Sequence, residues 1–258
     1  ERCEKSNYPP GLSSSVQRGA PWGMAHPTLD GPTVYLADGG APEQEVDHSL
    51  AGFALARRLG ADGWEVSGRL SADHIVLLAR SATFGWRRRP HAASPAAQSE
   101  APPLADLLAM DIDEVPMVSV AVENRATLDA VVLAARGAGA LERMLIRCPD
   151  LELLETAAAD LGHERPAFIH EAPLAAMATG PERHADRLRT GSIEGQAMMF
   201  GQWTGGLTAM FHRFGRLCVG RGATHVRMIR EFAQMGIDTV SSTHPDRLDE
   251  AQRGPGSP

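Results

Sequence analysis

The sequence predicts a single (β/α)8 barrel, in which eight parallel strands form a closed ring inside a layer of helices. Eight short apolar runs recur along the chain, and segments with the 3.6-residue period of an amphipathic helix lie between them. Glycines follow these segments at the points where helices end. The length of 258 residues suits one barrel. A doubly wound open sheet is the alternative, but no GxGxxG motif follows the first apolar run.

The elements follow one another in a regular order. The predicted strands cover residues 33–37, 63–66, 117–122, 144–146, 167–169, 196–200, 217–219 and 237–240. Each predicted helix places apolar residues on one face, as with Val46, Leu50 and Phe53, then Leu128 and Val131, Leu151 and Leu154, Leu207 and Phe211, and finally Val226, Ile229 and Phe232. Strict alternation of strand and helix predicts a parallel sheet with the helices outside.

One domain is predicted over residues 32–252, with flexible segments at its ends and within it. Residues 1–31 are rich in proline, glycine and serine, which predicts an N-terminal arm. Residues 87–103 read RRRPHAASPAAQSEAPP, and this composition predicts a flexible surface loop. Residues 253–258 form the predicted C-terminal tail.

Charge and amino-acid usage exclude several classes of function. The formal net charge of −7 disfavours a nucleic-acid-binding surface. Lys5 is the only lysine, so the barrel has no lysine nucleophile and no P-loop lysine. No apolar run reaches 18 residues, so no membrane span is predicted. Three widely spaced cysteines predict neither a disulfide framework nor a zinc site and favour a cytoplasmic location, although a signal peptide removed earlier would leave the same sequence.

Candidate site residues stand at the C-terminal ends of the predicted strands, where (β/α)8 barrels carry their active sites. The candidate catalytic residues are Asp38, Glu65, His170 and Glu171. The candidate ligand-binding residues are Ser67, Arg80, Arg147, Trp203 and Arg221. The arginines either bind an anionic ligand or neutralise the carboxylates. His170 and Glu171 are neighbours in a strand, so only one of them points into the barrel.

Both ends of the chain resemble glycerophosphodiester phosphodiesterases. VYLADGGAPEQE and FALARRLGADGWEVSGRLSADHIVLLAR are similar to that family's opening motifs. GIDTVSSTHPDRLDEA is similar to its closing G-V-D-G-I-I-T-D-x-P-D motif. The resemblance covers roughly residues 32–252 and is weak from 160 to 205. It implies a (β/α)8 barrel, in agreement with the number of predicted strands.

The resemblance also implies that most of the family's catalytic groups are replaced here. The positions of its two catalytic histidines fall on Asp38 and Ala79. Its three metal-binding carboxylates fall on Glu65, which is kept, and on Ser67 and Ala121. A hard divalent cation needs several oxygen ligands, so no cofactor is predicted, and Glu65 with Asp38 would hold Mg²⁺ or Ca²⁺ only weakly.

Three functional hypotheses follow. The first is a repurposed, metal-independent enzyme that acts on a small molecule by acid–base catalysis or charge stabilisation. The second is a pseudoenzyme that binds a ligand or a partner without turnover, which a barrel mouth filled by the protein's own side chains would favour. The third is a residual metal-dependent phosphodiester hydrolase. The expected ligand is a small molecule, anionic if the arginines bind it, and the oligomeric state is not predicted. Glu65 should pair with a cationic side chain: Arg80 is the first candidate, Arg147 or Arg221 the next, and His170 the alternative to an arginine.

Overall fold

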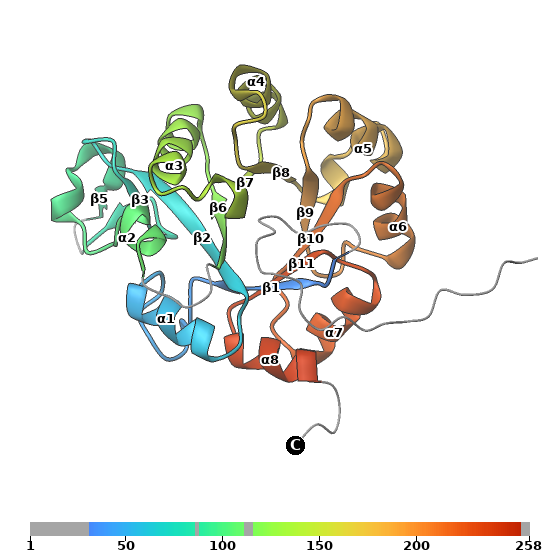
Figure 1. Ribbon diagram of the computed structural model, residues 1–258, viewed down its shortest axis with the longest axis horizontal. Coiled ribbons are helices and arrows are strands. Elements are labelled where there is room, and N and C mark those ends of the chain that lie inside the picture. The colour runs from blue at the N-terminus through green and yellow to red at the C-terminus, as the bar shows by residue number, and fades with distance from the viewer. Residues whose placement is uncertain (1–30, 86–87, 111–115, 254–258) are drawn as a thin grey trace, which may run out of the picture.

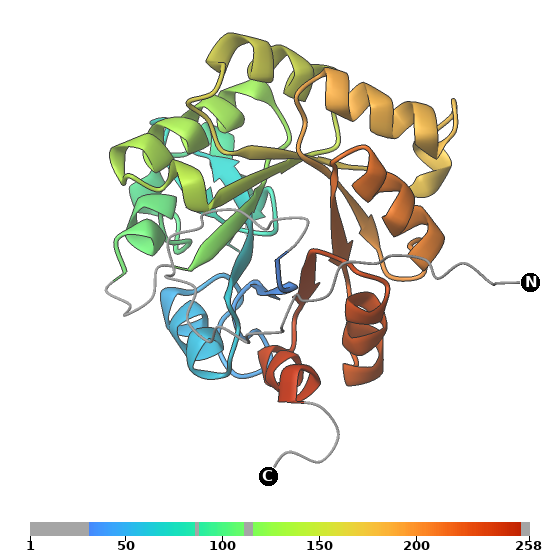
Figure 2. The same ribbon diagram turned by 45° about the vertical axis from the view of Figure 1, so that its right-hand side comes forward.

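The computed structural model describes residues 31–85, 88–110 and 116–253, and these form a closed (β/α)8 barrel (Figure 1). The predicted fold class is therefore confirmed. The helices surround the ring of strands, as the turned view also shows (Figure 2). The predicted arm and tail lie outside the described residues, except for Gly31 and Arg253.

Eight parallel strands of the described chain form the barrel wall. They are β1 (Val34–Asp38), β2 (Gly63–Leu70), β6 (Met117–Ala121), β7 (Met144–Cys148), β8 (Ala167–Glu171), β9 (Gly195–Met199), β10 (Leu217–Arg221) and β11 (Thr239–Ser242). Each strand pairs with the next in this order, and β11 pairs with β1 to close the ring. Every one of them overlaps a predicted strand.

Helices cover the outer face of this wall. They are α1 (Leu50–Arg58), α2 (Leu104–Leu108), α3 (Arg125–Gly137), α4 (Leu151–Leu161), α5 (Pro181–Thr190), α6 (Gly205–Arg213), α7 (Val226–Gln234) and α8 (Pro245–Arg253). Four begin at a polar N-cap whose side chain accepts a hydrogen bond from the backbone N–H three residues later: Ser49, Asn124, Asp150 and Thr204. In the described part of the chain, no helix is long and apolar enough to cross a bilayer.

The strand after the first helix continues beyond its predicted end. β2 runs to Leu70 and pairs in antiparallel fashion with β3 (Val76–Leu78), which forms the predicted hairpin. β4 (Thr83–Phe84) and β5 (Arg89–Pro90) form a second short hairpin. The hairpin of β2 and β3 carries the chain outward over one side of the barrel.

Part of the segment predicted as a flexible loop, 87–103, lies against this hairpin. Residues 91–93 and 96–98 form 3-10 turns, and His91 is buried. The backbone N–H of Leu78 donates to the carbonyl of Pro102 at 2.9 Å. The described part of the segment therefore packs on β3, and its flexibility stays a prediction.

Three acidic residues link neighbouring strands at the N-terminal end of the barrel. Asp62, Glu194 and Asp238 directly precede β2, β9 and β11. Each carboxylate accepts a hydrogen bond from a backbone N–H of the neighbouring strand: Tyr35 at 2.8 Å, Phe168 at 2.6 Å and Cys218 at 2.7 Å, respectively. A buried N–H without a partner is costly, so these carboxylates stabilise the starts of the strands.

Candidate ligand-binding site at the barrel mouth

Charged side chains converge at the C-terminal ends of the strands, a region called the mouth below. Leu36, Leu145, Ile169 and Val219 belong to the apolar cluster inside the barrel. Because side chains alternate along a strand, the next inward positions are Asp38, Arg147, Glu171 and Arg221. Asp38 is also in register with Glu65 of the neighbouring strand β2. Five predicted site residues from five strands therefore meet at the mouth.

Four of these residues form a closed ring of ion pairs, the mouth ring: Glu65, Arg147, Glu171 and Arg221. Arg221 donates to Glu65 Oε1 from Nε at 2.8 Å and from Nη2 at 2.6 Å, and from Nη1 to Glu171. Arg147 Nη2 lies 3.4 Å from the same Glu65 oxygen, and Arg147 Nη1 donates to Glu171 Oε2. Arg147 also donates from Nε to the Ser119 hydroxyl at 2.9 Å. Each arginine thus bridges the two carboxylates.

The mouth ring has a buried side and an accessible side. The side chains of Glu65 and Arg147 are each 1% exposed, whereas Glu171 and Arg221 are 26% and 19% exposed. Burial opposes ionisation of Glu65, but the charges of Arg147 and Arg221 outweigh it and lower its pKa to about 2. Glu65 therefore carries its negative charge at neutral pH, held in place by both arginines.

The expected arginine partner of Glu65 is present, but it is not Arg80. Arg80 follows β3 at the rim and donates to both oxygens of Asp38, at 3.0 and 3.3 Å. Its Nε and Nη2 also donate to Asp47 at 3.1 and 3.2 Å. Because Arg80 follows the outer hairpin, its guanidinium contacts Asp38 and Asp47 at the rim. Glu65 lies deeper and pairs with Arg147 of β7 and Arg221 of β10.

Sequence reasoning missed two residues of this arrangement, Asp47 and His48. His48 is buried in the loop before α1, and its Nε2 accepts the backbone N–H of Ser67 at 3.1 Å. Its Nδ1 therefore carries the proton and donates to Asp47 at 2.9 Å. Burial opposes ionisation of Asp47, but hydrogen bonds from His48 and Arg80 lower its pKa to about 2. Loop positions have no periodicity, so no sequence signal marked this pair.

The carboxyl group of Asp38 is harder to ionise than an exposed aspartate. Burial and the nearby charge of Glu65 raise its pKa, and the hydrogen bonds and charge of Arg80 oppose that rise only in part. Among the described residues, the ion pairs of the mouth and of Arg80 involve four carboxylates, Asp38, Asp47, Glu65 and Glu171, and three arginines. One carboxylate more than the number of guanidinium groups is consistent with the raised pKa of Asp38.

Two predicted site residues lie behind the barrel wall rather than in the mouth. His170 contacts His184, Gln196 and the carbonyl of Pro149, between the strands and α5. Trp203 is buried against Phe211 of α6 and donates to the carbonyl of Val219 at 3.1 Å. Glu171, and not its neighbour His170, is the member of that pair that faces the mouth.

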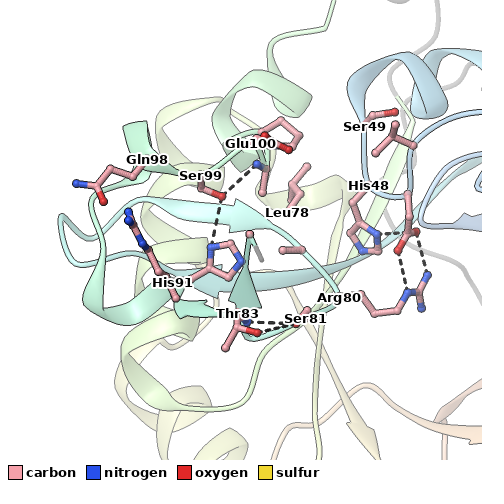
Figure 3. Close-up of a pocket in the computed structure, with 17 residues that line it drawn as sticks. His48, Ser49, Leu78, Arg80, Ser81, Thr83, His91, Gln98, Ser99 and Glu100 are labelled. Carbon is pink, nitrogen blue, oxygen red and sulfur yellow. Dashed lines mark hydrogen bonds and ion pairs between the residues drawn. The ribbon is translucent and has the colours of Figure 1, made fainter. Parts of the chain in front are cut away.

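A cavity of about 590 Å³ opens beside the mouth (Figure 3). It lies between the loop before α1, the end of β3 and residues 98–102. Arg80, Asp47 and His48 line it, so it shares a wall with the rim of the mouth. Its volume is in the range of small-molecule sites, roughly 300–1,000 Å³. The mouth and this cavity together form the candidate ligand-binding site.

The mouth does not fit the divalent metal ion that the family resemblance implies. Both oxygens of Asp38 accept hydrogen bonds from Arg80, and both oxygens of Glu171 accept from the ring arginines. Only Glu65 Oε2 is a buried carboxylate oxygen without a hydrogen-bond partner among these described residues. A hard divalent cation requires several oxygen ligands, and three guanidinium groups already supply the positive charge here.

Comparisons with known proteins agree on the fold. No protein-family model matches the sequence, and no curated protein matches it. Solved structures do match. A glycerophosphodiester phosphodiesterase from Thermotoga maritima is 13% identical with a TM-score of 0.72, over 87% of this chain and 99% of that one. A phosphodiesterase from Oleispira antarctica, in complex with the product sn-glycerol-3-phosphate, is 15% identical with a TM-score of 0.71, over 86% and 98%.

A candidate glycerophosphoryl diester phosphodiesterase from Silicibacter pomeroyi is 15% identical with a TM-score of 0.74, over 88% of this chain and 94% of that one. At such identities the likeness shows a shared fold and leaves the chemistry to the residues of the mouth.

Proposed function

We propose that this chain is a phosphodiesterase-like barrel that binds a small anionic ligand without a metal ion and does not turn it over. The observation that carries the proposal is the closed mouth ring. It occupies the end of the barrel axis, where (β/α)8 enzymes carry out their chemistry. Its guanidinium groups contact both oxygens of Glu171 and one oxygen of Glu65, so its carboxylates leave only one buried oxygen, Glu65 Oε2, without a hydrogen-bond partner.

The hydrogen bonds of His48 and Asp38, the two groups at the described mouth that could transfer a proton to or from a ligand on Arg80, support the same proposal. Hydrolysis of a phosphodiester needs an acid that protonates the leaving oxygen. The alignment with the family puts Asp38 and Ala79 at the two histidine positions. The imidazole at the rim, His48, uses one nitrogen for Asp47 and the other for the Ser67 backbone, so neither nitrogen is free. The repurposed enzyme would have to rely on a carboxyl group such as Asp38, which Arg80 holds with two hydrogen bonds.

An anion suits the accessible side of the site. Arg80 is 46% exposed, and a guanidinium offers five N–H donors in a planar fork that matches carboxylates and phosphates. A phosphate monoester can therefore take the place of the Asp38 carboxylate on Arg80, or of Glu171 on Arg221. The adjoining cavity, which Arg80 also lines, has room for the organic part of such a ligand. The Oleispira protein was solved with sn-glycerol-3-phosphate, which makes this compound the first probe.

Calorimetric titration of the full chain with sn-glycerol-3-phosphate tests the proposal. Binding should be the same with and without EDTA, and Arg80→Gln should weaken it at least about tenfold, since a charge-assisted bidentate contact is lost. Arg189→Gln is the control, because this arginine is exposed on α5 and pairs with Asp186 of the same helix. No hydrolysis of glycerophosphocholine is expected with Mg²⁺, Ca²⁺ or Mn²⁺.

Each alternative function has its own signature in these assays. Metal-dependent hydrolysis that Glu65→Gln abolishes would establish the residual hydrolase. Turnover that persists in EDTA and is lost in Asp38→Asn would establish the repurposed enzyme. Failure of both sn-glycerol-3-phosphate and inorganic phosphate to bind the parent chain would overturn the proposed anion site.

A further inference from the structure

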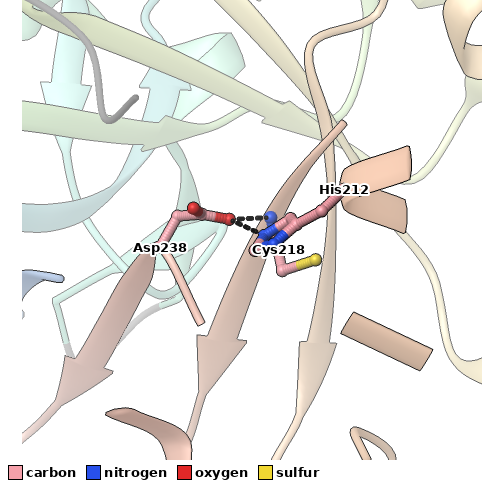
Figure 4. A group of neighbouring side chains, drawn as sticks. All are labelled: His212, Cys218 and Asp238. Carbon is pink, nitrogen blue, oxygen red and sulfur yellow. Dashed lines mark hydrogen bonds and ion pairs between the residues drawn. The ribbon is translucent and has the colours of Figure 1, made fainter. Parts of the chain in front are cut away.

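In the described part of the chain, two groups of side chains that could bind a metal ion lie away from the mouth. In the first, single ligand atoms of His212, Cys218 and Asp238 lie within 4.8 Å of one another (Figure 4). Asp238 Oδ2 accepts hydrogen bonds from the backbone of Cys218 at 2.7 Å and from His212 at 2.9 Å. Asp62 and Glu194 make the same backbone contact elsewhere in the barrel. Barrel closure thus explains this group without a metal ion.

The second group has no such explanation. It consists of His170 on β8, His184 on α5 and Gln196 on β9, three residues buried between the barrel wall and a helix. His170 Nδ1 lies 3.2 Å from His184 Nε2, and each of these nitrogens lies 2.9 Å from Gln196 Oε1. Three atoms with lone pairs therefore converge on one point.

The identity of the Gln196 atom at this point is fixed by its other contacts. The amide nitrogen of Gln196 donates to the carbonyls of Ala172 at 2.8 Å and Ala197 at 3.1 Å. A flipped amide would set its oxygen against both carbonyl oxygens. Oε1, an acceptor only, is consequently the atom that faces the two imidazoles.

In either tautomer of neutral His170, one ring nitrogen without a proton lies beside an acceptor oxygen. Its Nε2 lies 3.3 Å from the carbonyl of Pro149, which can only accept a hydrogen bond. With the proton on Nε2, His170 donates to Pro149 and its Nδ1 can accept from His184 Nε2, but Nδ1 then lies 2.9 Å from the acceptor Gln196 Oε1. A proton on Nδ1 serves Gln196 but leaves the bare Nε2 against Pro149.

We propose that His170 Nδ1, His184 Nε2 and Gln196 Oε1 bind a divalent transition-metal ion. The ligand atoms are 2.9–3.2 Å apart. Bonds of about 2.0–2.1 Å to a tetrahedral ion would separate its ligands by roughly 3.3 Å, so only a small adjustment is needed. The ion takes all three lone pairs, His184 keeps its proton on Nδ1, and His170 keeps its own on Nε2.

The second nitrogen of His170 has a contact of the kind found at metal sites. A metal-bound histidine usually donates its second N–H to a carbonyl or a carboxylate, as His170 would donate to Pro149. Two imidazole nitrogens and one amide oxygen suit Zn²⁺, Ni²⁺ or Cu²⁺ better than Mg²⁺ or Ca²⁺. The nearest charged groups, Arg187 and Glu155, form an ion pair with each other and so balance in charge. An ion here would join α5 to β8 and β9, a structural role that is independent of the mouth.

Titration of the EDTA-treated full chain with Zn²⁺, followed by calorimetry and thermal melting, tests this site. One Zn²⁺ should bind and raise the melting temperature. His184→Gln should weaken the affinity by more than the roughly 10- to 100-fold that loss of a group hydrogen-bonded to a metal ligand costs. His212→Gln, which removes the imidazole of the other group, should bind like the parent. The chain has ten histidines, so this comparison and not stoichiometry alone identifies the site.

A measurement on the parent chain keeps the test decisive if His184→Gln folds poorly. In ¹⁵N-resolved NMR of the imidazoles, Zn²⁺ should shift Nδ1 of His170 and Nε2 of His184 together. Equal Zn²⁺ affinity of folded His184→Gln and His212→Gln, or a spectrum in which neither nitrogen responds to Zn²⁺, overturns the proposal.

Discussion

Arg147 and Glu65 face each other inside the barrel, with both side chains 1% exposed and Arg147 Nη2 3.4 Å from Glu65 Oε1. Neither group can turn to water if the other is removed. Breaking a buried pair by removing one partner is costly because the remaining charge stays buried. This contact therefore links the charge of the mouth to the stability of the barrel.

Glu65→Gln should lower the free energy of unfolding by about 3–5 kcal/mol, since it leaves part of the Arg147 and Arg221 charge uncompensated. Urea denaturation measures the loss. Glu123→Gln is the matched control, because Glu123 is 64% exposed and pairs with Arg69, a contact that should contribute less than about 1 kcal/mol. Equal, small losses in the two variants would show that the mouth ring does not stabilise the fold.

The stability of the protein should fall steeply in acid. The pKa of Glu65 is lowered from 4.5 to about 2 in the folded state, so its contribution is present above pH 4.5 and is lost as the pH falls through about 2. A shift of this size corresponds to roughly 3 kcal/mol. Urea denaturation between pH 7 and 2 checks this, and Glu65→Gln should flatten the low-pH part of the curve. An unchanged slope in that variant would contradict the lowered pKa of Glu65.

Asp38→Asn should change the free energy of unfolding by less than about 1 kcal/mol, because burial and Glu65 already disfavour the ionised form of this residue. The amide keeps an oxygen for Arg80, which is accessible to water. The same variant should bind sn-glycerol-3-phosphate at least as well as the parent, since the anion no longer competes with a carboxylate. Thermal melts and calorimetry measure both effects, and a loss as large as that of Glu65→Gln would refute the weak role of Asp38.

His48→Ala should destabilise the protein by about 1–3 kcal/mol, because the backbone N–H of Ser67 loses its acceptor. His48 also has a φ of 62°, in the left-handed region that asparagine tolerates better than alanine. His48→Asn should therefore lose less stability than His48→Ala. Denaturation of the two variants gives the comparison, and the opposite order would rule out a backbone contribution at this position.

Gly63→Ala should destabilise the barrel by about 1–3 kcal/mol or more, because a Cβ there would lie 2.2 Å from the carbonyl oxygen of Met117 on the neighbouring strand. Gly137 offers the matched control at the end of α3, where a Cβ meets open space. Gly137→Ala should be neutral or slightly stabilising, since alanine favours the helix. Thermal denaturation distinguishes the two, and tolerance of Gly63→Ala would mean that β2 and β6 can move apart.

The sequence predicted the barrel and most of the mouth, because both depend on short-range patterns. Apolar runs and helical periods identify every barrel strand, and the rule that sites lie at the C-terminal strand ends selects Asp38, Glu65, Arg147, Glu171 and Arg221. The rule fails for His170 because a shift of one residue in a strand reverses the side chain, which places it behind the wall.

The contacts of residues in loops and hairpins depend on the three-dimensional placement of those segments and could not be predicted from the sequence. Trp203 follows a strand end, but its ring is buried against Phe211 of α6. Arg80 forms ion pairs with Asp38 and Asp47, and not with Glu65, because its hairpin ends at the rim. Asp47 and His48 become visible only when the loop before α1 meets β2 in space.

The carboxylates of Asp62, Glu194 and Asp238 accept hydrogen bonds between three pairs of neighbouring strands, at the end of the barrel opposite the mouth. Each of them holds a neighbouring strand without help from any mouth residue. A barrel wall held together in this way tolerates substitutions of charged residues at its opposite end, provided that each new charged side chain has a partner of opposite charge. Charged residues at the mouth can then be substituted while the strands keep their register at the opposite end.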